Sequence, residues 1–75
     1  MPNARLSPEV RELLSVLRDV LDVPPGEEPY DVRARAILGW SALGALLDNP
    51  NVSPADATRV LRVQGARHLP EQADQ

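Results

Sequence analysis

Residues 36 to 47, which read AILGWSALGALL, predict a helix that is apolar on two opposite sides. On a helical wheel of about 100° per residue, two sets of apolar residues separate. One set contains Ala36, Ile37, Trp40, Leu43, Gly44 and Leu47, and the other contains Leu38, Ala42, Ala45 and Leu46. A surface helix of a soluble protein normally has a single apolar stripe. We therefore expect this helix to be covered from both sides, by its own chain or by a second molecule.

The chain has 75 residues and no cysteine, so neither disulfides nor thiolate metal sites can stabilise it. This length predicts a single domain with a small core. We expect an ordered part over residues 6–68 and a tail over residues 69–75. Because the chain contains one tryptophan, one tyrosine and no phenylalanine, we expect an aliphatic core with Trp40 as its only large aromatic residue.

Three helix starts are visible in the sequence. Ser7 and Ser53 each precede a proline, and an acidic residue follows within the next turn, which is typical of a helix N-terminus. Pro29 begins a similar segment without the serine. With Pro24 and Pro25 as breakers, these signals predict an all-α, three-helix bundle with helices over residues 8–23, 30–48 and 54–64.

The first and third helices each have one apolar stripe. In the first helix we expect the buried residues to be Val10, Leu13, Leu14, Leu17, Val20 and Leu21, with Val16 at the margin. In the third helix we expect them to be Ala57, Val60, Leu61 and Gln64. The proline-rich segment 24–29 predicts an extended, stiff connector between the first two helices.

Charge is distributed unevenly along the chain. Residues 1–32 contain three arginines and seven acidic residues, whereas residues 33–68 contain five arginines and two acidic residues. Arg33 and Arg35 lie near the start of the middle helix, where the helix dipole disfavours cations. Nearby acidic side chains, Glu27, Glu28 and Asp31, or a partner protein, would offset this cost. Such a pattern allows ion pairs within one molecule or between two.

No catalytic, metal or cofactor motif is present. His68 is the only histidine and lies beside the expected tail, and no glycine-rich phosphate loop occurs. We expect a protein that is not an enzyme and that needs no cofactor, metal or small-molecule substrate. The sequence begins without a secretory signal and lacks a run of about 20 apolar residues, which predicts a cytoplasmic protein with no membrane span. The use of arginine without lysine suggests a GC-rich, bacterial or phage genome.

Two functions remain open. We expect a protein–protein interaction or assembly module, self-associating as a homodimer or binding another protein through the middle helix. The interface candidates are Leu38, Trp40, Ala42, Leu43, Gly44, Leu46 and Leu47. The small residues among them allow a second helix to approach closely. The alternative is a helix-turn-helix regulator that binds DNA through outward-facing Thr58, Arg59 and Arg62, although the net charge of −3 argues against it.

Overall fold

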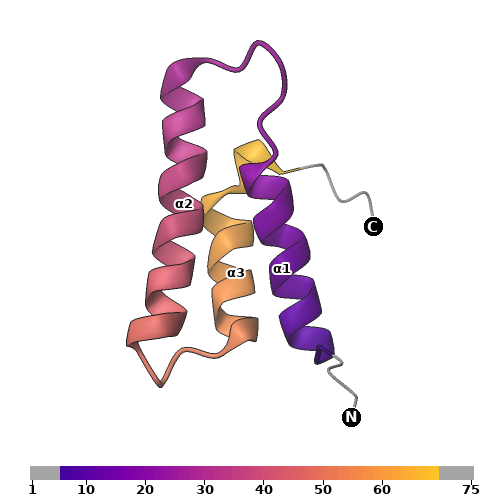
Figure 1. The fold of residues 1–75 in the computed structure, drawn as a ribbon, viewed down its shortest axis with the longest axis vertical. Coiled ribbons are helices and arrows are strands. Elements are labelled where there is room, and N and C mark those ends of the chain that lie inside the picture. The colour runs from indigo at the N-terminus through magenta and orange to yellow at the C-terminus, as the bar shows by residue number, and fades with distance from the viewer. Residues whose placement is uncertain (1–5, 70–75) are drawn as a thin grey trace.

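The computed structural model describes residues 6–69, and this part of the chain folds into three α-helices followed by one short 3-10 helix (Figure 1). The elements are α1 (Pro8–Leu21), α2 (Pro29–Asp48), α3 (Pro54–Gln64) and η1 (Ala66–His68). No strand occurs within residues 6–69. The predicted all-α, three-helix fold is confirmed, and each helix begins and ends within two residues of its predicted bounds. The predicted tail lies outside the described residues except for Leu69.

Serine side chains cap two of the three helices. Ser7 Oγ accepts a hydrogen bond from the backbone N–H of Val10 at 3.2 Å, at the start of α1. Ser53 Oγ accepts from the N–H of Asp56 at 3.1 Å, and the Asp56 carboxylate accepts from the N–H of Ser53 at 3.2 Å. This reciprocal capping box satisfies two N–H groups that the first turn of α3 leaves without a helical partner.

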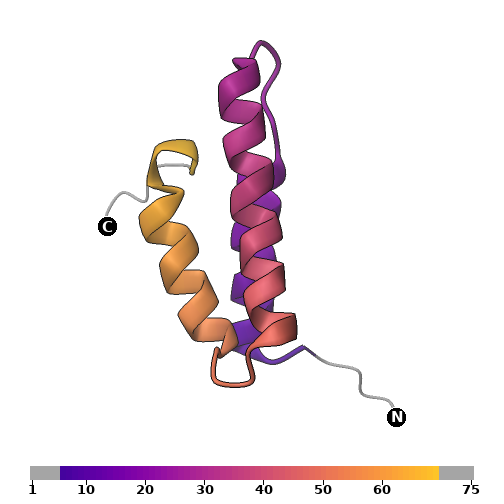
Figure 2. The same ribbon diagram turned by 90° about the vertical axis from the view of Figure 1, so that its left-hand side faces the viewer.

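The core lies mainly between α1 and α3, and α2 packs along both of them (Figure 2). The buried apolar residues are Leu13, Val16, Leu17 and Val20 of α1, Ala42 of α2, and Ala57 and Leu61 of α3. The middle helix of the sequence is therefore not the central helix of the bundle. It contributes one alanine to the buried cluster. Leu38 and Leu46 pack partly against that cluster, and the other large apolar residues of α2 are exposed.

The predicted stripes of α1 and α3 are rotated relative to the observed ones. In α1, Val16 is buried, whereas Leu14 and Leu21 are nearly half exposed. Val16 lies one turn from both Leu13 and Val20, so the buried side of α1 turns toward α3 and away from Leu14. In α3, the prediction that Val60 and Gln64 are buried is wrong, because both lie at the open edge between α2 and α3.

The connector before α2 contains a tight turn and is not extended as predicted. Gly26 has a φ of 82°, and the N–H of Glu27 donates to the carbonyl of Pro24 at 3.2 Å. A proline followed by a glycine with positive φ is typical of a type II turn, which reverses the chain. The turn places Glu27 over α2, where its carboxylate lies 2.8 Å from Arg35 Nε.

Arg35 is a buried cation that joins three segments of the chain. Its side chain is only 8% exposed, and its Nη1 donates to the backbone carbonyls of Asp19, Val20 and Asp22 at 3.3, 3.0 and 3.4 Å. Two of these carbonyls belong to the last turn of α1, whose carbonyls lack the usual donor four residues later and which carries the negative end of the helix dipole. Arg35 therefore caps α1 while Glu27 balances its charge.

Replacing Arg35 should weaken the fold strongly. Arg35→Met removes the charge and the donors but keeps a long side chain, and leaves Glu27 and the α1 carbonyls without their partner. We expect the free energy of unfolding, measured by urea denaturation, to fall by about 2–3 kcal/mol. Arg11→Met, at an exposed position of α1, should change it by less than about 0.5 kcal/mol. Equal losses in the two variants would contradict the role assigned to Arg35.

Candidate functional site

One side of α2 packs against its own chain. Arg35, Gly39 and Ala42 are the buried residues of this helix, and Leu38 and Leu46 are partly buried against the core cluster. Of the predicted interface residues, Leu38, Ala42 and Leu46 thus lie within the fold of the single chain. The side of α2 that holds the helix in place consists largely of a cation and small residues.

The opposite side of α2 carries exposed apolar residues, which we call the exposed stripe. It consists of the exposed residues Ile37, Trp40, Leu43 and Leu47 and of Gly44, which is partly exposed. Trp40 is 76% exposed and Leu47 is 83% exposed, and Ile37 and Leu43 are about half exposed. The prediction that Trp40 belongs to the core is wrong, because Trp40 lies about 140° around the helix from Arg35, which faces inward. The sequence predicts that both sides of this helix are covered, and within residues 6–69 the chain itself covers one of them.

The two glycines of α2 lie in different surroundings. A Cβ atom at Gly39 would lie 2.9 Å from Leu21 Cδ2, so Gly39 allows α1 to pack closely against α2. A Cβ atom at Gly44 would meet no atom within 4 Å. Glycine within a helix costs about 1 kcal/mol relative to alanine. Packing within the chain accounts for Gly39 but not for Gly44, which belongs to the exposed stripe.

Two further exposed residues extend this surface toward the start of α2. Tyr30 is 77% exposed, and Val32 is exposed to a smaller degree. The sequence interpretation missed both because the helical wheel covered only residues 36–47. Tyr30 precedes Ile37 by seven residues and Val32 precedes Ala36 by four, so a wheel over the whole helix places them on the same half of its circumference.

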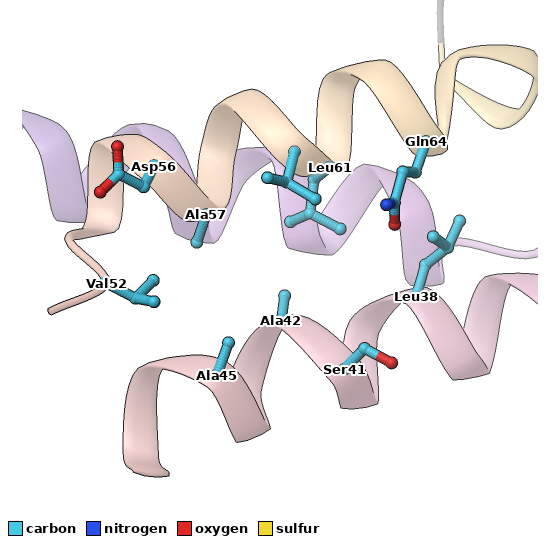
Figure 3. Close-up of a pocket in the computed structure, with 10 residues that line it drawn as sticks. Leu38, Ser41, Ala42, Ala45, Val52, Asp56, Ala57, Leu61 and Gln64 are labelled. Carbon is cyan, nitrogen blue, oxygen red and sulfur yellow. The ribbon is translucent and has the colours of Figure 1, made fainter. Parts of the chain in front are cut away.

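An apolar groove lies between α2 and α3. It has a volume of about 170 Å³. Six apolar side chains point toward one another across it (Figure 3): Leu38, Ala42 and Ala45 of α2, Val52 of the preceding loop, and Ala57 and Leu61 of α3. Ser41, Asp56, Val60 and Gln64 complete its lining, and the Asp56 carboxylate points away from the space. The small alanine side chains leave this groove open, and no residue of the exposed stripe lines it.

The alternative DNA-binding residues of α3 are not presented together. Thr58 is 6% exposed and its hydroxyl donates to the Pro54 carbonyl at 2.9 Å, so the prediction that it faces outward is wrong. Thr58 precedes Leu61 by three residues, which is nearly one helical turn. The two residues therefore lie on the same buried side of α3. Arg59 pairs with Asp56 at 2.7 Å, and Arg62 pairs with Glu12 of α1 at 2.8 Å.

The described part of the chain contains few other features that point to a particular chemistry. Within residues 6–69, no three histidine or carboxylate side chains gather closely enough to hold a metal ion. No helix in this range combines the length and apolar character needed to cross a membrane. No family model, curated protein or solved structure matches this chain. The exposed stripe is therefore interpreted from its own residues.

The Asp56 carboxylate gives α3 a dependence on pH. The hydrogen bond from the Ser53 N–H, together with those from Arg59 and the Ser53 hydroxyl, lowers the pKa of Asp56 below the ordinary value of an aspartate. A group with a lowered pKa stabilises the fold in full above its unfolded value, and the stabilisation is lost as the pH falls through the folded value. Urea denaturation at several pH values should show that Asp56→Asn loses less stability than the native chain between about pH 5 and about pH 2.

Glu9→Gln serves as the control, because Glu9 is exposed in the first turn of α1 and its carboxylate forms no hydrogen bond or ion pair among residues 6–69. Its stability should follow that of the native chain across the same pH range. If Asp56→Asn and the native chain gave parallel curves, the capping box would not contribute to the pH dependence.

Proposed function

We propose that this chain is a small, non-enzymatic assembly module whose copies associate through the exposed stripe of α2. The observation that carries the proposal is the exposure of Trp40 and Leu47, which lie seven residues apart on one side of a helix whose other side packs against its own core. Tryptophan and large aliphatic residues are typical anchors of protein interfaces, because burying them removes much apolar surface from water.

The composition of α2 supports this proposal. Its fully buried residues are Arg35, Gly39 and Ala42, and Leu38 and Leu46 pack partly against the core, so the large apolar residues of the exposed stripe contribute little to the fold of one chain. Because these residues are exposed, they form a contiguous apolar surface on α2. Such surfaces on soluble proteins mark interaction sites. Gly44, which has no neighbour within 4 Å of its missing Cβ, would let a second helix approach this surface closely.

The contacts of α3 weigh against the alternative of DNA binding. Thr58 is buried, and Arg59 and Arg62 each pair with one acidic side chain, so each arginine would have to break its own ion pair before it could contact phosphate. The protein is also net negative, which opposes approach to a polyanion. We therefore propose association between protein chains, and not DNA binding, as the function.

The test measures mass and tryptophan exposure over a dilution series. Light scattering should give a mass of two chains at high concentration and of one chain on dilution. Because Trp40 is the only tryptophan, its emission should shift to longer wavelength as dilution returns it to water. Leu47→Glu places a charge in the exposed stripe, and it should give the one-chain mass and the long-wavelength emission at every concentration.

Val63→Glu is the matched control, because Val63 is 73% exposed but lies on α3 outside the stripe. This variant carries the same added charge and should associate like the native chain. Circular dichroism of both variants should retain the helical spectrum of the native chain, since neither residue is buried. A one-chain mass for the native protein from about 1 µM to about 1 mM would overturn the proposal.

A further inference from the structure

The charges at the two ends of the exposed stripe indicate how two copies would meet. We infer, on the basis of the proposed function, that α2 of a second copy packs antiparallel to α2 of the first copy. Arg33 of each copy then lies beside Asp48 of the other. The occupant of the exposed stripe is thus a second copy of this chain. Two identical ion pairs, related by a two-fold axis, then close the two ends of the contact.

Arg33 and Asp48 have the positions that this arrangement requires. On the wheel, Arg33 lies about 20° from Trp40, in line with the stripe at its N-terminal end, and Asp48 lies about 80° from Trp40, at the edge of the stripe. They are 15 residues apart, which corresponds to about 22 Å along the helix. Both are exposed, and neither forms an ion pair with any residue in the range 6–69.

An antiparallel copy places both charges favourably, whereas a parallel copy does not. In a parallel pair, Arg33 would face Arg33 and Asp48 would face Asp48, so like charges would meet at both ends. In an antiparallel pair, opposite charges meet at both ends. Asp48 is the last residue of α2, where the helix dipole disfavours an anion. Antiparallel packing brings Asp48 near the positive N-terminal end of the second helix and removes this disadvantage.

The small residues of α2 are also arranged for antiparallel contact. Ala36 and Gly44 lie four residues before and four residues after Trp40. Reversing one helix about Trp40 therefore sets Ala36 of one copy opposite Gly44 of the other, twice in the same contact. The same reversal sets Arg33 within one residue of the level of Asp48. Small residues and opposite charges thus come into register together, with the two Trp40 side chains near the axis.

Charge reversal tests the arrangement. Arg33→Asp and Asp48→Arg should each weaken association on the order of tenfold, because each creates two like-charge contacts. The double variant Arg33→Asp/Asp48→Arg should restore most of the loss, because it exchanges the two partners. Arg11→Asp, exposed on α1, changes the net charge as Arg33→Asp does and should have a small effect. Single reversals that leave association unchanged would overturn the antiparallel arrangement.

Disulfide trapping gives a second, independent readout, because the chain contains no cysteine. An equimolar mixture of Arg33→Cys and Asp48→Cys, with one chain carrying a size tag, should oxidise mainly to the mixed dimer. Disulfides between two copies of the same variant would overturn the antiparallel arrangement, since identical positions would then be about 22 Å apart. If light scattering still gave a two-chain mass, the proposed function would stand while this inference failed. A one-chain mass would remove both.

Discussion

The contact of Arg35 with the end of α1 determines how α2 is oriented in this protein. A guanidinium group that is 8% exposed must keep its hydrogen bonds and its counterion, because an unpaired buried charge costs several kcal/mol. The carbonyls of Asp19, Val20 and Asp22 and the carboxylate of Glu27 provide them. Rotation of α2 about its own axis would break these bonds. Since the helix turns about 100° per residue, fixing Arg35 inward fixes Trp40 and Leu47 outward.

The helix positions were predictable from the sequence because their signals are local. Ser7 and Ser53 each cap the turn that follows, and proline tolerates the first position of a helix, so short segments determine where the helices begin. The rotation of the helices was not predictable in the same way. Whether Val16 or Leu14 is buried depends on where α3 lies. An arginine such as Arg35 is expected to be exposed from the sequence alone, because the α1 carbonyls that bind it lie 13 to 16 residues earlier in the chain.

The candidate site was likewise predictable from the sequence only in part. The periodicity of α2 predicted two apolar sides, but only the packing shows that Leu38, Ala42 and Leu46 contact the core whereas Trp40, Leu43 and Leu47 do not. The turn at Gly26 was visible as a proline followed by a glycine, a signal that the proline-rich composition of the connector obscured. Thr58 was misplaced because its hydroxyl, polar in sequence, bonds the Pro54 carbonyl of its own helix and needs no solvent.

The two sides of α2 are subject to separate physical constraints. Residues of the inward side change the stability of a single chain, because they are exposed when it unfolds and buried when it folds. Trp40 and Leu47 are largely exposed in both states, so the fold of one chain gains little from their apolar character. Association is the process in which their burial contributes free energy, about 25 cal/mol for each Å² of apolar surface removed from water. Under the proposed assembly, that contribution adds to the stability of a small core and makes it depend on protein concentration.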